Sequence, residues 1–127
     1  MNLLLDTHVF IWWDQRSAVL NAGARAAIED EGNNIFVSAA SVWEIAIKRR
    51  NGKLRFNGSA AAAIAANGFH ELPILPREAE TAGELAWRHN DPFDRVLVAQ
   101  AICQGFVFVT GDETIRALES VPRLWAR

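Results

Sequence analysis

Cysteine is almost absent from this sequence, with Cys103 as its only example among 127 residues. A single cysteine excludes an internal disulfide and a cysteine-rich zinc site. Because Cys103 stands in an apolar helical pattern, we expect it to be a small buried hydrophobic residue. This sparing use of cysteine is typical of proteins from a reducing compartment.

Long hydrophobic runs are also missing. No segment approaches the roughly 20 apolar residues that a helix needs to cross a bilayer. The apolar run at the N-terminus ends at Asp6, which makes it too short for a signal peptide, and it has no basic leader. We therefore expect a cytoplasmic protein that has no membrane partner.

An excess of positive charge, the usual mark of a nucleic-acid-binding protein, is a third absence. Thirteen Lys and Arg residues stand against fifteen Asp and Glu residues, which gives a net charge of −2. Any contact with nucleic acid must then rest on a local patch. The run KRRNGKLR at 48–55 holds five of the thirteen basic residues. It is either a solvated helix end or a track for a phosphate backbone.

What the sequence does contain is an alternation of strand and helix patterns. Its 127 residues, half of them apolar and without a repeat or a linker, predict one domain over 1–127. The strand patterns lie at 2–6, 35–38, 69–74, 106–110 and 123–125. The helical patterns lie at 18–30, 39–50, 59–67, 76–88, 92–105 and 113–119. Such alternation favours an α/β fold with a central parallel sheet that is covered on both faces.

The stretch HNDPFDRVLVAQA at 89–101 places a carboxylate where a helix is otherwise apolar. Asp94 lies on the stripe that Leu97, Val98 and Ala101 fill over the next two turns. A buried charge without a partner is costly, so it is usually paired, protonated or bound to a metal. Asp91, followed by Pro92, already has the pattern of an N-cap. Asp94 therefore needs another explanation.

Four carboxylates from distant parts of the chain are expected at one edge of the sheet. Asp6 ends the first strand, Asp112 follows the strand at 106–110, and Asp94 begins the helix that leads to that strand. Glu44 lies about five residues into the helix after 35–38, roughly 7 Å beyond the strand at 1.5 Å per residue. Ligands bind beyond the carboxyl ends of parallel strands. Oxygen donors without His or Cys suit Mg²⁺ or Mn²⁺.

Each of these acids also has a purely structural interpretation. Asp6 would cap a short helix that follows it, and Asp94 would complement the dipole of its helix. A helical wheel puts Glu44 on the polar side of its helix, where a pair with Lys48 at i+4 explains it as well as metal binding does. Asp112 would be an ordinary turn residue in TGDE. Taken singly, the residues leave these alternatives open; their coincidence at one edge favours a site.

Four segments, in this order and spacing, resemble those of one protein family. They are LLLDTHVFIWW (3–13), SAASVWEIAIKRRNGKL (38–54), HNDPFDRVLVAQA (89–101) and FVTGD (108–112). They are similar to the PIN-domain ribonucleases, specifically the VapC-type toxins of bacterial toxin–antitoxin pairs. The resemblance covers nearly the whole chain. It implies a three-layer α/β/α sandwich around a parallel sheet, and an acidic Mg²⁺ or Mn²⁺ site that hydrolyses RNA to 5′-phosphate and 3′-hydroxyl ends.

The resemblance also implies which residues form that site. Asp6 matches the family's first-strand aspartate, Glu44 its helix glutamate and Asp94 its third acid. Asp112 takes the fourth position, which varies between Asp and Asn in the family. Asp91 is first a helix cap and only second a substitute ligand or supporting group. The implied partners are a cognate antitoxin, an RNA substrate and a second copy of the chain in a homodimer.

Two other functions compete with this interpretation. A metal-dependent phosphatase with Asp6 as its nucleophile would want a second Asp two residues on, where this chain has His8. A non-catalytic module that binds RNA or a partner would not need the intact acidic set. Trp12, Trp13 and Trp43 predict an exposed hydrophobic groove near the site, which an antitoxin segment would cover.

Overall fold

A five-stranded sheet forms the centre of the computed structural model, which describes residues 1–127. The strand order is β3-β2-β1-β4-β5, and every pair of neighbours is parallel. The strands are β1 (Asn2–Leu5), β2 (Asn34–Ser38), β3 (His70–Leu72), β4 (Val107–Thr110) and β5 (Arg123–Trp125). The expected α/β fold with a parallel sheet is therefore confirmed.

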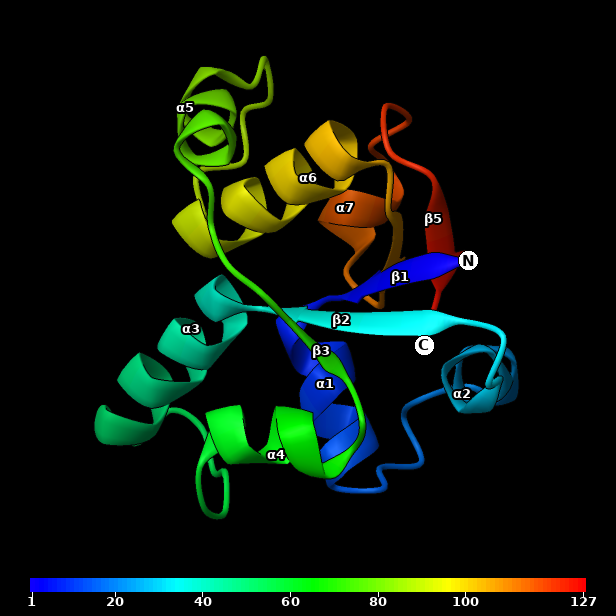
Figure 1. Ribbon diagram of the computed structural model, residues 1–127. Helices are drawn as coiled ribbons and strands as arrows, with labels where there is room; N and C mark the ends of the chain where they lie inside the picture. The colour runs from blue at the N-terminus through cyan, green and yellow to red at the C-terminus, as the bar shows by residue number, and fades with distance from the viewer.

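Seven helices cover the two faces of this sheet. They are α1 (Thr7–Asp14), α2 (Ala22–Glu29), α3 (Ala39–Arg50), α4 (Ala60–Ala66), α5 (Pro76–Glu84), α6 (Pro92–Gln104) and α7 (Glu113–Arg116). In Figure 1, α1 to α4 lie below the sheet and α5 to α7 lie above it, which makes the three layers of an α/β/α sandwich. The chain runs through β2 from α2 on the right to α3 on the left, so the carboxyl ends of the parallel strands face left.

The alternation of side chains along β1 supplies both layers of the core. Leu3 and Leu5 pack with residues of α1 to α4, whereas Leu4 packs with residues of α6 and α7. All three leucines are fully buried, and each burial contributes about 1.5–3 kcal/mol. Because successive strand side chains point to opposite faces, a strand covered on both sides appears in the sequence as a continuous apolar run.

The helix predicted at 18–30 starts later than expected, as α2. Asn21 is its N-cap: the side-chain oxygen accepts a hydrogen bond from the backbone N–H of Ala24 at 2.8 Å. The amide nitrogen of Asn21 donates to the carbonyl oxygen of Trp125 at 2.9 Å. The start of α2 is thus fixed by a contact with β5, which the pattern at 18–30 does not reveal.

The helix predicted at 76–88 is α5, and it ends four residues early, at Glu84. Carbonyl groups beyond this point bind the guanidinium of Arg95 rather than continuing the helix. The helix predicted at 113–119 likewise ends early as α7, and the edge strand predicted at 69–74 shortens to β3. The helix α1 has no counterpart among the predicted helical patterns; only the interpretation of Asp6 as a cap implied a short helix there. The order of the other elements is as predicted.

Cys103 is half-buried, so the prediction of a buried hydrophobic residue is wrong. Its Sγ lies 3.7 Å from Oγ1 of Thr81, because this flank of α6 faces α5 rather than the sheet. None of the seven helices has the length and apolar character that crossing a membrane requires.

Candidate active site

Asp6 follows the last residue of β1, at the carboxyl edge of the sheet. Its side chain is buried, and both of its oxygens accept hydrogen bonds: Oδ1 from the backbone N–H of Thr7 at 2.8 Å, and Oδ2 from the hydroxyl of Thr110 at 2.7 Å. Asp6 thus caps α1, as one interpretation of the sequence predicted. Burial raises the pKa of its carboxyl to about 6, against the opposing effect of these hydrogen bonds.

Asp94 lies in the first turn of α6, and the stripe beneath it is apolar as predicted, with Leu97, Val98 and Ala101 buried. Its Oδ2 lies 2.6 Å from Nε2 of His89. Burial raises the pKa of Asp94 to about 7; the contact with His89 opposes this rise, and the charge of Asp6 adds to it. A carboxylate in this position is costly to ionise and gains from a cation.

Asp91 is the N-cap of α6, as predicted. Its side chain accepts a hydrogen bond from the backbone N–H of Asp94 at 3.0 Å. The cap and the first-turn acid are therefore two separate residues, and Asp94 is not needed to begin the helix.

Glu44 on α3 is buried, so its expected place on a polar helix face is wrong. The wheel considers one helix alone, whereas α1 and α6 both pack against α3. The predicted pair with Lys48 exists, with 2.5 Å between Nζ and Oε2. Burial lowers the pKa of Lys48, but the hydrogen bond and the charge of Glu44 outweigh this and leave it raised. The other oxygen, Oε1, is buried without a hydrogen-bond partner.

Asp112 is half-buried at the start of α7, two residues beyond β4. Its Oδ1 accepts from the backbone N–H and the hydroxyl of Thr114, at 2.9 and 2.7 Å, so the residue also caps its helix. Its own backbone N–H donates to the Thr110 hydroxyl that holds Asp6. One threonine thus connects two of the predicted acids.

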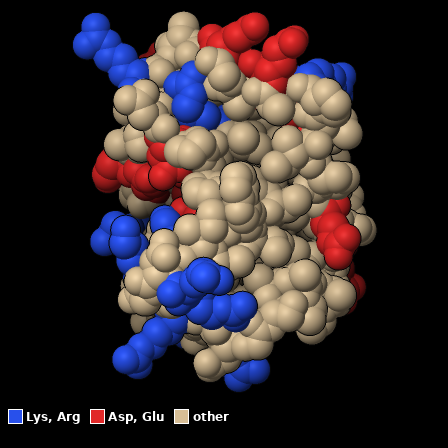
Figure 2. All heavy atoms as spheres, turned by 90° about the vertical axis from the view of Figure 1, so that its left-hand side faces the viewer, with Lys and Arg blue, Asp and Glu red and all other residues tan.

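Asp6, Asp94 and Asp112 lie at one edge of the sheet. They are close enough that the charges of Asp6 and Asp112 both raise the pKa of Asp94. Asp6 and Asp112 line a hollow of about 360 Å³ together with His8, Trp12 and Arg127. Glu44 is connected to these aspartates by Lys48, whose ammonium group interacts with the charges of both Glu44 and Asp94. Figure 2 faces this edge and shows a group of acidic side chains on the left with basic side chains above and below it; other acidic side chains lie at the top and on the right.

The donor chemistry of these residues fits a hard divalent cation. The acids offer carboxylate oxygens, their crowding raises pKa values that a cation would offset, and Oε1 of Glu44 is a buried oxygen that lacks a partner. As the side chains lie, however, no three His, Cys, Asp or Glu residues are arranged to hold one ion. The residues therefore fit a divalent cation in their charge and in the type of their donor atoms, but not in the present arrangement of their side chains.

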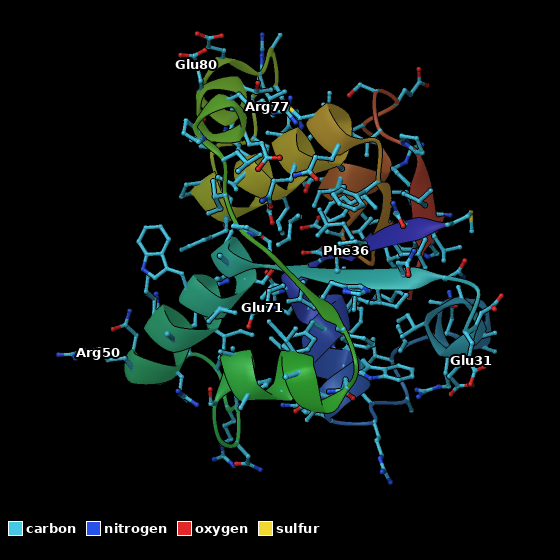
Figure 3. All side chains as sticks on the ribbon, in the orientation of Figure 1. Glu31, Phe36, Arg50, Glu71, Arg77 and Glu80 are labelled. Carbon is cyan, nitrogen blue, oxygen red and sulfur yellow. The ribbon has the colours of Figure 1, made fainter.

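The basic run at 48–55 is only partly available to a ligand. Lys48 is paired with Glu44, and the guanidinium of Arg49 donates to the carbonyl oxygens of Phe56 and Gly58. Arg49 is nevertheless exposed, as are Arg50, Lys53 and Arg55, whose side chains form no hydrogen bond or salt bridge. Figure 3 shows Arg50 projecting away from the end of α3.

The prediction of one exposed aromatic groove is wrong for two of its three tryptophans. Trp12 and Trp13 are half-buried, because Trp12 packs over Gly111 and Trp13 packs on Phe69. Only Trp43 is exposed, with 60 % of its surface accessible. It lines an apolar groove of about 380 Å³ between α3, α4 and β3, apart from the acidic hollow.

Sequence reasoning assigned no role to His89 or Arg95, although both stand in the HNDPFDR stretch. Their contacts join a loop to a helix, so no periodic pattern marks them. The available signals were the density of polar residues on either side of Pro92 and the resemblance of this stretch to a segment of the family.

The PIN domain family profile matches residues 3–121 of the chain. The chain is also 30 % identical over 118 residues to Ribonuclease VapC22 of Mycobacterium tuberculosis, covering 91 % of this chain and 90 % of that protein. This chain belongs to the PIN-domain family. Its likeness to a VapC protein extends over nearly the full length of both.

Two solved structures of toxin–antitoxin proteins have the same fold as this PIN domain. VapBC2 from Rickettsia felis, bound to a promoter DNA fragment, matches with a TM-score of 0.71 at 12 % identity, over 100 % of both chains. A toxin–antitoxin complex from Klebsiella pneumoniae matches with a TM-score of 0.64 at 18 % identity, over 96 % of this chain and 95 % of that one. At these identities the likeness concerns the fold.

Proposed function

We propose that this PIN-domain protein is a metal-dependent endoribonuclease and the toxin of a toxin–antitoxin pair. The main observation in support is that Asp6 is buried and that Asp94 has only 13 % of its side chain exposed. The charge of Asp6 reaches Asp94, and desolvation raises the pKa values of the two carboxyls to about 6 and about 7. Two such carboxylates are costly to keep ionised at neutral pH unless a cation compensates them. The 30 % identity to a protein named as a ribonuclease supports RNA as the substrate class.

Asp6, Glu44, Asp94 and Asp112 are the residues that would hold Mg²⁺ or Mn²⁺. A bound divalent cation supplies an activated water and relieves negative charge on the phosphate during hydrolysis. Around it the chain's own groups fix the carboxylates: the Thr110 hydroxyl holds Oδ2 of Asp6, and His89 holds Oδ2 of Asp94. Lys48 neutralises Oε2 of Glu44 and leaves Oε1 free.

A cognate antitoxin is the proposed protein partner, with a homodimer of this chain as the expected assembly and the cytoplasm as the place of action. Antitoxin-bound structures stand among the structural neighbours. The apolar groove beside the exposed Trp43 offers a surface that a partner would cover.

The test is hydrolysis by the purified chain of single-stranded RNA and of a phosphate monoester, with Mg²⁺, with Mn²⁺ and in excess EDTA. We expect cleavage of RNA with either metal, none in EDTA, and no hydrolysis of the monoester. Equal cleavage of RNA in excess chelator would rule out the metal mechanism. Hydrolysis of the monoester alone would favour the phosphatase, and RNA binding without cleavage would favour the non-catalytic module.

A further inference from the structure

Arg95 is the neighbour of Asp94 in sequence, but its charge is directed elsewhere. Its guanidinium donates hydrogen bonds to four backbone carbonyl oxygens: those of Ala82 at 2.8 Å, Leu85 at 2.8 Å, Trp87 at 2.7 Å and His89 at 3.0 Å. It forms no salt bridge. A planar guanidinium with five donors in fixed directions can bind such a set, which a lysine ammonium cannot reproduce.

The four carbonyls belong to the end of α5 and to the segment 85–90 that joins α5 to α6. Ala82 lies in the last turn of α5, where carbonyl groups lack partners within the helix. The other three belong to non-helical backbone beyond Glu84. A single side chain therefore fixes the path of the whole connecting segment.

This segment carries His89, whose imidazole reaches back to the first turn of α6. Its Nε2 lies 2.6 Å from Oδ2 of Asp94, and its ring packs against Trp87 with the ring centroids 4.8 Å apart. The side chain of Asp94 is 13 % exposed and that of His89 is 27 % exposed. The imidazole is thus more exposed than Asp94 and lies within hydrogen-bond distance of one of its two oxygens.

We propose that His89 is a positioning residue for the carboxylate of Asp94, and that Arg95 acts by holding His89 in place. The contacts run from the Arg95 guanidinium to the His89 carbonyl, and from the His89 imidazole to Asp94. With Oδ2 held, Oδ1 of Asp94 points in a defined direction. The inference rests on the proposed function, because the positioned group is one of the acids that would hold the cation.

The first experiment compares His89→Ala with His89→Gln by calorimetric titration of Mg²⁺ and by kcat and KM for RNA cleavage. Alanine removes the contact, whereas glutamine keeps a nitrogen donor near the position of Nε2. We expect His89→Ala to bind Mg²⁺ about 10–100-fold more weakly and to lower kcat more than it raises KM, as losses of such supporting groups do. His89→Gln should recover most of the affinity.

Arg88→Ala is the matched control, because Arg88 is an exposed cation on the same segment and makes no hydrogen bond to the site. If the effect of His89→Ala came only from removing a basic group near the acids, Arg88→Ala would share it. We expect the Mg²⁺ affinity of Arg88→Ala to stay within about twofold of the wild type, since exposed charges interact weakly through water.

The second experiment separates positioning by Arg95 from its role in ending α5. Arg95→Lys is made in the wild-type chain and in the His89→Ala chain, and thermal midpoint and Mg²⁺ affinity are measured for all four proteins. A residue that acts through another gives non-additive effects. We expect Arg95→Lys to weaken Mg²⁺ binding only when His89 is present, while it lowers the thermal midpoint in both backgrounds.

The outcomes distinguish this inference from the proposed function. Mg²⁺ affinity of His89→Ala equal to that of the wild type would overturn the role of His89, whatever Arg95→Lys does. If Arg95→Lys weakens Mg²⁺ binding equally in the wild-type and His89→Ala chains, the proposal that Arg95 acts by holding His89 would be overturned. A wild-type chain that neither binds Mg²⁺ nor cuts RNA would overturn the proposed function, and this inference with it.

Discussion

Asp6 and Asp94 are carboxyl groups that are harder to ionise in the folded chain than in an unfolded one. Burial raises the pKa of Asp6 from 3.8 to about 6 and that of Asp94 from 3.8 to about 7. Both groups ionise near pH 4 in an unfolded chain, so folding takes up protons between about pH 4 and about pH 7. The free energy of unfolding of the metal-free chain therefore loses a contribution from each group as the pH rises through this window.

The substitution Asp94→Asn should raise the stability of the metal-free chain, and increasingly so at higher pH. Near pH 4 the side chain is uncharged in both proteins, so their thermal midpoints should be similar. By about pH 8 the variant should melt about 5 °C higher or more, since a few kcal/mol of charge burial is removed. Thermal unfolding in EDTA across this range measures the difference, and a gap that stays constant with pH would contradict the account.

Glu44 shows what the sequence reveals at this scale and what it does not. The matching position in the family marked it as a site residue, but its pattern suggested a polar helix face. Glu44 is buried on a helix against which α1 and α6 both pack, and both are far from it in sequence. Asp94 could be predicted better, because its apolar neighbours stand on its own helix. His89 could not, because its partner is reached across a non-helical turn.

At the scale of elements, the turn between β4 and α7 sets the position of Asp112. A Cβ at Gly111 would lie 2.7 Å from Cζ3 of Trp12 and 3.2 Å from Cβ of Arg127. The first distance is closer than two carbon atoms approach without a shift of one element. Glycine at this position therefore lets the turn pack directly on the indole of α1.

Gly111→Ala should lower the free energy of unfolding by about 1–3 kcal/mol, because it forces apart two packed elements. It should also reduce cleavage, since Asp112 is the next residue. Gly83→Ala in α5 is the control: its added Cβ meets nothing within 4 Å and should stabilise the helix by about 0.5–1 kcal/mol. Urea unfolding measures both changes, and equal stability of the two variants would show that the tight contact is easily relieved.

No periodic pattern marked α1, but the order of the other elements was predictable from periodicity, and several of their ends were not. The helix at 76–88 stops at Glu84 because the following carbonyls bind Arg95. Glu78 in the same helix is fully buried and accepts hydrogen bonds from the Leu75 N–H and the Gln104 amide. Its neighbours Arg77 and Glu80 point outward from α5 (Figure 3). A run of charged residues does not show which one is buried.

At the scale of the whole molecule, the proposed partner surface and the acidic site lie close together but remain distinct. The apolar groove is lined by Trp43, Val42 and Ala46 of α3, by Ile64 of α4 and by Leu72 of β3. Trp43 also contacts Phe93 of α6, with the ring centroids 5.2 Å apart. A partner that covers this groove would reach the rim of the site without needing to enter it.

Trp43→Ser should weaken the complex with the proposed cognate antitoxin by about tenfold or more, as the loss of a buried interface tryptophan does. RNA cleavage by the free chain should change little, because Trp43 holds none of the four acids. Ile102→Ser is the control, since Ile102 is an exposed apolar residue of α6 that does not line the groove. Equal antitoxin affinity of wild type and Trp43→Ser, measured by calorimetry, would place the partner elsewhere.

RNA cleavage and Mg²⁺ binding by Asp94→Asn, measured together, test the central claim most directly. The account predicts that this variant folds, binds Mg²⁺ weakly and no longer cuts RNA. Asp91→Asn should remain close to the wild type in both measurements, because Asn caps a helix about as well as Asp. An Asp94→Asn protein that binds Mg²⁺ normally and cuts RNA at nearly the wild-type rate would contradict the assignment of the site.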